Sequence, residues 1–369
     1  PPTMNGGSSR PHRFAKSLSA KNDVTVCTTS NNGPYITDSF RVVYLDFWRV
    51  RTKYIVSKIL SYVLFNLGLV RFKDFYLERQ FFKKNKDKYD IVIATYPELI
   101  NLIIGAKIVE SSPETKLIID FRDGMCFEPL VRYANPIVKN NLVKLEKYLC
   151  SRSSHIITVG EALTDYFKDI NENCSTIYNS HDKPARMYGN KLSNSSRIRI
   201  VHFGSLGLSK ERNLNFLSVA LEQLCAIELP LEIVFVGNLT NKEKTILGRA
   251  NPSISFRLPV DKSEKQALFS DFDAALFIGV PSQVSYISSK IFDYIEAGLP
   301  ILGVCKGNEA ELIINTEGLG LVSDFEPASI VSMFESFCNK GISKNFYANR
   351  FKTDVQMNKL EQLCLNIYC

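Results

Sequence analysis

Short apolar runs rich in β-branched residues alternate with helix-forming stretches along this chain of 369 residues. The first series of runs lies at 24–28, 91–95, 116–120, 155–159 and 176–178. A second series lies at 199–203, 232–236, 254–257, 274–278, 300–304 and 319–322. Helices are expected in the second series at 213–226, 264–269, 289–297, 308–315 and 327–339. Strands separated by enough chain for a helix pair in parallel, so this pattern predicts an α/β fold.

A polar stretch rich in turn-forming residues, 182–197, separates the two series and is the expected linker. The chain length also favours two domains. We therefore predict an N-terminal domain over 1–181 and a C-terminal domain over 198–369, with the last helix packing back on the N-terminal domain. Each domain should hold a Rossmann-like parallel sheet. The carboxyl edges of both sheets should face a central cleft, because open α/β sheets bind ligands at that edge.

Composition excludes several classes of protein. A hydrophobic fraction of 45% is ordinary for a globular chain and excludes a mostly disordered one. The nine cysteines are widely spaced and form no Cys-x-x-Cys or Cys/His cluster. This pattern argues against a disulfide framework or a structural zinc site and favours a reducing compartment. Residues 1–10 lack the apolar core of a signal peptide, so we expect a cytoplasmic protein.

The positive charge is concentrated in the segment 46–88. This segment has eleven basic and four acidic residues, a net charge equal to the +7 of the whole chain, and ten aromatic residues. Such a composition suits an anionic membrane surface, which places the protein peripherally on the cytoplasmic face. A helical excursion packed on its own domain is an equally open interpretation. A membrane span over 54–70 is disfavoured by Lys58 and Asn66, and nucleic-acid binding by the lack of a known module.

Three stretches in the C-terminal half suggest a site for a nucleotide diphosphate. The first is 201–213, a strand followed by a turn with Gly204 and Ser205 and then by Lys210 and Arg212 before a helix. Glycine lets the backbone approach a phosphate, a helix N-terminus offers free N–H groups, and cations neutralise charge. A plain strand-to-helix turn with solvated charges is the alternative. The stretch is not a Walker loop, since its spacing differs from G-x-x-x-x-G-K-[ST].

The second stretch is 282–301, in which Ser288 or Ser289 can cap a helix that Gly298 ends. Lys290 lies in the first turn of this helix, and Asp293 lies one turn further, within reach of ribose hydroxyls. A well-capped surface helix is the alternative. The third stretch consists of two loops that follow strands, one with Gly237 and Asn238 and one with Val260. Simple turns explain these loops equally well.

Taken in chain order, these stretches resemble the motifs of the retaining glycosyltransferases of family 4, which have the two-domain GT-B fold. The most specific match is the run Lys290-Ile-Phe-Asp-Tyr-Ile-Glu-Ala-Gly-Leu-Pro300, similar to the family's Lys-x-Phe-Glu-Tyr-x-x-x-Gly-x-Pro. The further matches are the Pro-rich loop from Pro2 to Gly7 with Arg10, the strand end Ile118 to Asp123, the run Asn179 to Asp182, Gly204 with Leu206 and Lys210, and the stretch 263–278. The strand end resembles an element of members that build the bacterial cell envelope, which implies polysaccharide or lipopolysaccharide biosynthesis.

Two positions depart from the family pattern. Ser285 stands where the family has the first Glu of its acidic pair, of which Asp293 is the second acid. Ser205 stands where the family has an Arg after the loop glycine, and we expect Arg212 to supply that positive charge instead.

The resemblance implies transfer of a sugar with retention of configuration and without a bound metal. The expected catalytic residues are Asp123, which would orient the acceptor hydroxyl, and Lys210 and Arg212, which would stabilise the leaving diphosphate. The expected donor-binding residues are Gly204, Ser205, Gly237, Asn238, Val260, Ser285, Ser288, Ser289, Lys290 and Asp293. The expected acceptor-binding residues are Gly6, Gly7, Arg10 and Arg122.

We therefore expect a hexosyltransferase-type enzyme with a nucleotide diphosphate sugar as donor, UDP-sugar being favoured, and a lipid-linked or growing glycan as acceptor. No cofactor, metal or nucleic acid is expected, because the sequence has no Asp-x-Asp pair at a strand end and no His/Cys cluster with metal-ligand spacing. Two alternatives stay open. One is a non-catalytic partner subunit that keeps the fold, which Ser285 would permit, and the other is a nucleotide-sugar epimerase on the same fold.

Overall fold

The computed structural model describes residues 6–30, 39–46, 79, 81–82, 88–128, 136–182, 197–206, 214–248, 253–260, 264–342 and 348–368. Lys210, Arg212, most of the basic segment 46–88 and most of the expected linker 182–197 lie outside the described residues. None of the helices in the described part combines the length and the apolar character that a bilayer crossing needs.

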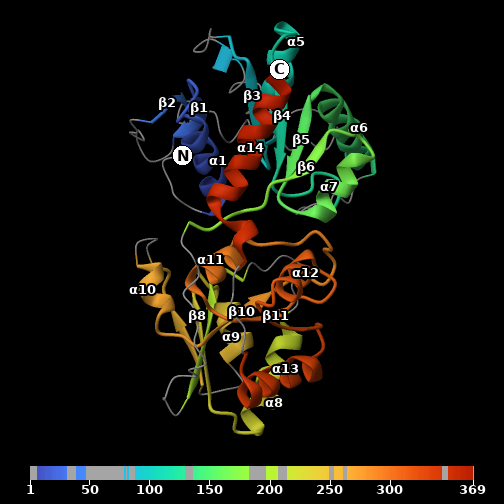
Figure 1. Ribbon diagram of the computed structural model, residues 1–369. Helices are drawn as coiled ribbons and strands as arrows, with labels where there is room; N and C mark the ends of the chain where they lie inside the picture. Colours follow the sequence, from blue (N-terminus) through green and yellow to red (C-terminus); the bar gives the residue numbers. More distant parts are fainter. Residues whose placement is uncertain are drawn as a thin grey trace. The chain divides into compact units, whose positions relative to one another are not determined.

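The chain divides into two compact units (Figure 1). Unit 1 comprises Pro1–Tyr178 and Gln356–Cys369, and unit 2 comprises Asn179–Val355. Both units contain a parallel sheet with helices, which confirms the predicted α/β class.

Unit 1 is built on a parallel sheet in the order β3-β4-β5-β6, with a separate parallel pair β1-β2. Its strands are β1 (Thr25–Ser30), β2 (Arg41–Asp46), β3 (Ile91–Tyr96), β4 (Lys116–Phe121), β5 (His155–Thr158) and β6 (Cys174–Thr176). Its helices are α1 (Gly6–Leu18), α5 (Leu99–Ser111), α6 (Pro136–Arg152), α7 (Glu161–Lys168) and most of α14 (Thr353–Tyr368). The apolar runs identified these strands because a parallel strand buries both of its faces.

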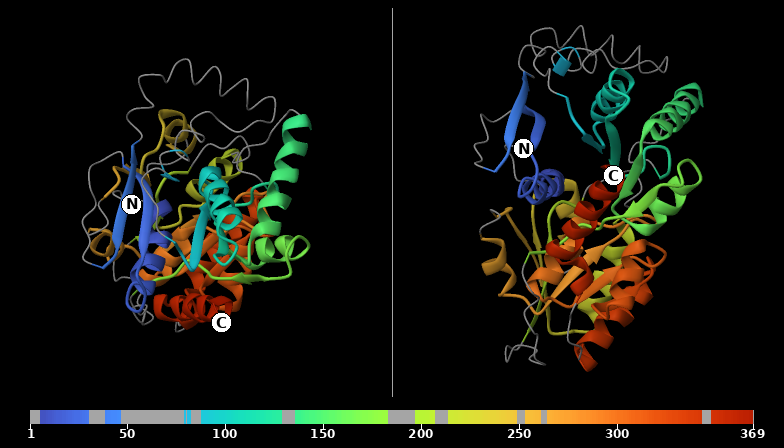
Figure 2. Two further views of the ribbon diagram at one scale, coloured as in Figure 1. Left: turned by 90° about the horizontal axis from the view of Figure 1, so that it is seen from above. Right: turned by 45° about the horizontal axis from the view of Figure 1, so that its top comes forward.

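Alternate residues of β4 belong to two different hydrophobic clusters. Leu117, Ile119 and Phe121 pack with residues of α5, α6 and α7. Ile118 packs with residues of α1 and α14, among them Phe14 and Leu360. Figures 1 and 2 show α1 and α14 together on one face of this sheet and α5 and α6 on the other. The two ends of the chain therefore complete one layer of unit 1.

A buried ion pair joins α1 to β4 on the face that α1 covers. Arg10 Nε donates to Asp120 Oδ1 at 2.9 Å, and Arg10 Nη2 lies 2.8 Å from the same oxygen. Arg10 is 3% exposed and Asp120 is fully buried. Arg10 Nη1 also donates to the carbonyl of Ile177, and Thr95 Oγ1 donates to Asp120 Oδ2 at 3.2 Å. Both charges are thus hydrogen-bonded, which is the condition for burying an ion pair without a large penalty.

Unit 2 is built on a six-stranded parallel sheet in the order β12-β11-β10-β7-β8-β9. Its strands are β7 (Ile198–Phe203), β8 (Leu231–Val236), β9 (Ile254–Arg257), β10 (Ala274–Ile278), β11 (Ile301–Val304) and β12 (Gly320–Ser323). Its helices are α8 (Asn215–Ala226), α9 (Asn241–Gly248), α10 (Lys265–Phe269), α11 (Ser289–Ala297), α12 (Glu309–Thr316), α13 (Pro327–Lys340) and the short η1 (Asn349–Phe351). The chain moves outward from β7 to β9 and then restarts at β10 on the other side of β7. The carboxyl edge between β7 and β10 is therefore the topological switch point, where sheets of this kind bind ligands.

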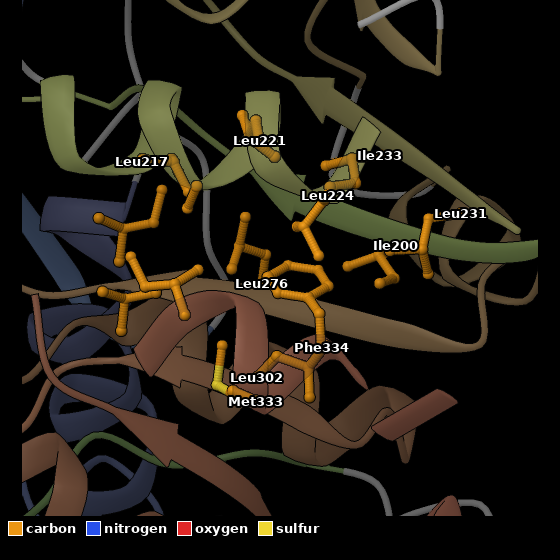
Figure 3. Close-up of a cluster of buried hydrophobic side chains, with 14 of the residues drawn as sticks. Ile200, Leu217, Leu221, Leu224, Leu231, Ile233, Leu276, Leu302, Met333 and Phe334 are labelled. Carbon is orange, nitrogen blue, oxygen red and sulfur yellow. The ribbon is translucent and has the colours of Figure 1, made fainter. Parts of the chain in front are cut away.

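The main core of unit 2 lies between one face of its sheet and the helices α8, α9 and α13. Leu217, Leu221 and Leu224 of α8 point toward the same interior as Phe334 of α13 and Ile200 of β7 (Figure 3). Residues of α10, α11 and α12 are not part of this cluster. This packing anchors β7 and β10 and leaves their carboxyl ends to the loops that follow them.

The predicted element bounds agree closely with the structure in unit 2. The strands 254–257 and 274–278 and the helix 289–297 are confirmed to the residue, and the other predicted bounds of that unit differ by at most two residues. In unit 1 the strand β6 begins two residues before the predicted 176–178, and β2 was not predicted. The predicted loop around Gly6 and Gly7 is wrong, because both residues lie in the first turn of α1. Their local glycine signal was outweighed by packing of the apolar side of α1 on the sheet.

Replacing Arg10 with Met should destabilise the protein by about 3–5 kcal/mol, because the buried Asp120 would lose its cationic partner. The matched control is Lys21→Met, which breaks the exposed pair of Lys21, just after α1, with Glu361 of α14 and should cost no more than about 1 kcal/mol. The measurement is denaturant unfolding of both variants. Equal shifts of the two midpoints would show that the buried pair contributes no more than a surface pair.

Candidate functional site

The backbones of Gly204 and Gly237 meet where β7 and β8 end. Gly204 has a φ of +93° and Gly237 a φ of +157°. A Cβ on Gly237 would lie 2.7 Å from the carbonyl carbon and oxygen of Gly204, so no side chain fits there. The N–H of Gly204 donates to the carbonyl of Val236 at 2.7 Å and continues the pairing of the two strands. The two glycines therefore give the sheet edge a turn without side chains, as their positions after strands predicted.

Lys290 of α11 reaches across this turn. Its Nζ donates to the carbonyl of Ser205 at 2.8 Å. A Cβ on Gly204 would lie 2.8 Å from Lys290 Cε, so the glycine also leaves room for the lysine. Ser288 is the N-cap of α11, its Oγ accepting from the N–H of Lys290, and Gly298 ends the helix in the left-handed conformation. Gly204, Ser205, Gly237, Ser288 and Lys290, five of the predicted donor-binding residues, thus lie together at the switch point.

Asp293 forms an ion pair with Lys265 of α10. The Lys265 ammonium also lies 5.1 Å from the centre of the Phe203 ring, at the end of β7. Lys265 was not identified from the sequence, because nothing in its local pattern indicates that α10 packs beside α11. A carboxylate paired in this way is held in place and keeps acceptor capacity for hydroxyl groups.

Asn308 fixes the loop that follows β10. Its Nδ2 donates to the carbonyls of Val280 and Gln283 at 2.8 and 2.7 Å, and its Oδ1 accepts from the N–H of Val280 at 3.2 Å. A Cβ on Gly279 would lie 2.0 Å from the same Oδ1. Asn308 was missed as a site residue, although a glycine after β10 and an Asn at the start of α12 could have suggested the contact. The loop held in this way leads to Ser285, which is half-buried.

The remaining predicted donor residues follow the neighbouring strands. Asn238 is exposed after β8, Val260 is half-buried after β9, and Ser289 is half-buried in the first turn of α11. The carboxyl ends of parallel strands meet at one edge, so these loops lie along the same edge as Gly204. The roles of all these residues stay predictions.

In unit 1, Arg122 and Asp123 follow β4, and Asp123 is half-buried. Burial raises the pKa of the Asp123 carboxyl above its ordinary value; Arg122 opposes this rise and Asp120 adds to it. Among the described residues the Asp123 side chain has no hydrogen-bond partner, in contrast to Asp120. Arg10 was predicted to contact an acceptor, but its guanidinium is buried in the pair with Asp120 and serves the packing of α1.

Glu146 of α6 holds the loop that contains Asp123. Its carboxylate accepts from the N–H of Cys126 at 2.9 Å and from the hydroxyl of Tyr166 at 2.6 Å. The Tyr166 ring in turn stacks on Phe127, with ring centres 4.8 Å apart. Burial raises the pKa of Glu146. Burial, together with the nearby Glu146 carboxylate, raises the pKa of the Cys126 thiol to about 12. No sequence signal marked Glu146, because its partners come from two distant elements.

No protein-family model matches this sequence, and a search of curated proteins gave no match. Solved structures do match it. The α,α-trehalose-phosphate synthase (UDP-forming) of Burkholderia vietnamiensis is 11% identical with a TM-score of 0.62, and the match covers 97% of this chain and 98% of that one. The lipopolysaccharide outer core galactosyltransferase WaaB, in its apo form, is 10% identical with a TM-score of 0.57, over 89% of this chain and 85% of that one.

A third match is a point mutant of TarM from S. aureus, solved with fondaparinux, alpha-GlcNAc-glycerol and UDP. It is 13% identical with a TM-score of 0.51, and the match covers 73% of this chain and 59% of the TarM chain. These identities establish the fold alone. This chain has the GT-B fold. In a GT-B protein each of the two domains is Rossmann-like, as are the two parallel-sheet units seen here.

Glu146→Gln should flatten the pH dependence of stability. The folded pKa of Glu146 is raised, so its contribution to stability is complete below the ordinary value of 4.5 and is lost as pH rises through the folded pKa. Gln does not titrate and can still accept from Cys126. As pH rises from 4.5 through the folded pKa, the variant should therefore lose less stability than the wild type in thermal unfolding. Exposed Glu114→Gln is the control, and a profile for Glu146→Gln that matches this control would contradict the interpretation.

Proposed function

We propose that this GT-B protein is a glycosyltransferase that moves a sugar from a nucleotide diphosphate sugar, with UDP-sugar favoured, to a glycan or lipid-linked acceptor. The observation that supports it best is the Lys290 ammonium held over the turn between Gly204 and Ser205 at the switch point of unit 2. A cation beside bare backbone, next to the N-terminus of α11, is an arrangement suited to a diphosphate. UDP in the TarM structure and the UDP-forming synthase support the choice of nucleotide.

The chemistry proposed for unit 2 is stabilisation of the leaving diphosphate. Negative charge grows on the diphosphate as its bond to the sugar breaks, and preorganised cations and N–H groups lower the energy of that state. Lys290 supplies one such cation. Lys210 and Arg212 are proposed to add two more, and Asp293, held by Lys265, is proposed to accept hydrogen bonds from the ribose. Reaction with retention and without a metal ion is part of this proposal, because the protein's own cations take the place of a divalent ion.

The chemistry proposed for unit 1 is orientation of the acceptor hydroxyl by Asp123, with Arg122 as a neighbouring contact. Asp123 suits this role because it lies just after a strand in a loop fixed by Glu146 and has no hydrogen bond of its own within the described residues. Gly6 and Gly7 at the start of α1 are proposed to approach the acceptor through their backbone. WaaB, a lipopolysaccharide outer core galactosyltransferase, favours an acceptor of the bacterial cell envelope, such as lipopolysaccharide. The segment 46–88 is proposed to hold the protein at the cytoplasmic face of the membrane.

Ser285 supports a second candidate, a non-catalytic partner subunit that binds a nucleotide sugar without transferring the sugar. Glu is usual at this position in the family that the sequence resembles, and a serine hydroxyl cannot supply its charge. The loop is nevertheless well ordered by Asn308, so the fold of this region does not depend on the missing acid.

Lys290→Met should weaken the binding of UDP by about 10- to 150-fold, because a contact of a cation with phosphate contributes roughly 1.5–3 kcal/mol. The matched control is Lys340→Met. Lys340 is exposed at the end of α13. Because a helix that follows a parallel strand returns to the opposite edge of the sheet, Lys340 lies away from the switch point. The measurement is calorimetric titration of the full chain with a panel of nucleoside diphosphates.

Release of UDP from UDP-sugars, with and without a chelator, separates the candidates. UDP release that a chelator does not abolish supports the transferase, whereas binding without release favours the partner subunit. A changed sugar nucleotide formed without any acceptor would indicate an epimerase. If Lys290→Met and the wild type bind UDP with equal affinity, the switch-point site is excluded as the binding site for the diphosphate.

Asp123→Asn should abolish most transfer to an acceptor and leave the affinity for UDP unchanged, because Asp123 lies in the other unit. In the wild type the ionised carboxylate is the form that accepts a hydrogen bond. Since its folded pKa lies above the ordinary 3.8, transfer should fall on acidification through a pKa above that value. The pH profile of the transfer rate checks this, and a variant with full activity would exclude Asp123.

A further inference from the structure

Lys290 has a second hydrogen-bond acceptor beneath the turn, the side chain of His202. His202 is the next-to-last residue of β7 and is fully buried. Its Nδ1 lies 3.0 Å from the carbonyl oxygen of Leu276 on β10, and its Nε2 lies 3.4 Å from Lys290 Nζ. A carbonyl can only accept, so Nδ1 has the hydrogen, and an ammonium can only donate, so Nε2 facing Lys290 has a lone pair and the ring is a neutral imidazole. The ammonium of Lys290 donates to that lone pair.

The same carbonyl of Leu276 has a second partner on α11. Tyr294, one turn after Lys290, places its hydroxyl 3.5 Å from the Leu276 oxygen, and that hydroxyl accepts from the N–H of Phe203 at 3.0 Å. Residues four apart lie on one face of a helix, so Lys290 and Tyr294 attach α11 to β7 and β10 at two points. The buried Tyr294 fixes the helix, and His202 contacts the end of the Lys290 side chain.

The His202 ring packs 5.6 Å from the ring of Phe235, but such packing does not require a histidine. His202 continues the alternation of Ile198 and Ile200, whose side chains belong to the apolar core of unit 2. An apolar side chain would fill such a place without the cost of burying two polar nitrogens. The Nδ1 of this imidazole contacts the sheet, and its Nε2 contacts Lys290 at the candidate site.

We infer that His202 is a positioning residue for Lys290. Lysine has four rotatable bonds, and each acceptor that its ammonium contacts restricts where the charge can lie. A second acceptor on a rigid, buried ring restricts the ammonium to the place between that ring and the carbonyl of Ser205, over the turn at Gly204. A charge held in place before the ligand arrives needs no reorganisation when it meets a phosphate. This inference rests on the proposed function, because it concerns how Lys290 meets a diphosphate.

Two amide variants of the full chain separate the two nitrogens of His202. His202→Asn keeps a donor near the Nδ1 position for Leu276 and has no atom near the Nε2 position. His202→Gln can place its amide oxygen near the Nε2 position and so restore an acceptor for Lys290. His202→Asn should lower the affinity for UDP about 3- to 30-fold, and His202→Gln should recover most of this loss. The affinity for uridine should not change in either variant, because uridine has no phosphate.

The decisive measurement repeats these titrations in a Lys290→Met background. If His202 acts through Lys290, His202→Asn should then change the affinity for UDP by less than about twofold. An equal loss in both backgrounds, or a matching loss of affinity for uridine, would overturn the inference and leave His202 as a structural residue. If both amide variants unfold, His202→Phe, which fills a similar volume, replaces them. Its expected results are the same as those for His202→Asn. If Lys290→Met alone leaves the affinity for UDP unchanged, the proposed site itself fails, which is a different result.

Discussion

The contact between the backbones of Gly204 and Gly237 determines the geometry of the candidate site in unit 2. Two parallel strands end side by side there, and any Cβ on either glycine would strike backbone or the Lys290 side chain. The lysine can cross the strand ends only because this space is free of side chains. The other features of the site, including the cap at Ser288 and the ion pair of Asp293 with Lys265, are arranged around that crossing. A turn lined by backbone and one cation is well suited to a ligand with concentrated negative charge.

Buried polar groups explain how both units hold their loops. In unit 1 the pair of Arg10 with Asp120 attaches α1 to the centre of the sheet, and Glu146 holds the loop after β4. In unit 2 the amide of Asn308 holds the loop after β10. Each of these groups has hydrogen-bond partners from distant elements, so each would be costly to break and each fixes a segment at a strand end. Rigid scaffolding of this kind is what allows loops to present binding groups.

Different observations support the GT-B fold and the proposed function. The GT-B fold follows from the two parallel-sheet units together with the solved structures that match most of the chain at 10–13% identity. Such identities do not transfer an activity, because one fold hosts many reactions. The transferase proposal depends instead on the groups at the switch point of unit 2 and on Asp123 in unit 1.

The sequence by itself determined the α/β class, most element bounds in unit 2 and the placement of Gly204, Gly237 and Lys290 at strand and helix ends. These are local properties: parallel strands are apolar on both faces, and caps and glycines mark where elements begin and end. Only the tertiary structure decided the partners. It buried Arg10 against Asp120, put Gly6 and Gly7 into a helix, paired Asp293 with Lys265 and set His202 beneath Lys290. Each of these contacts joins residues from separate elements, and the local sequence pattern does not indicate which elements pack together.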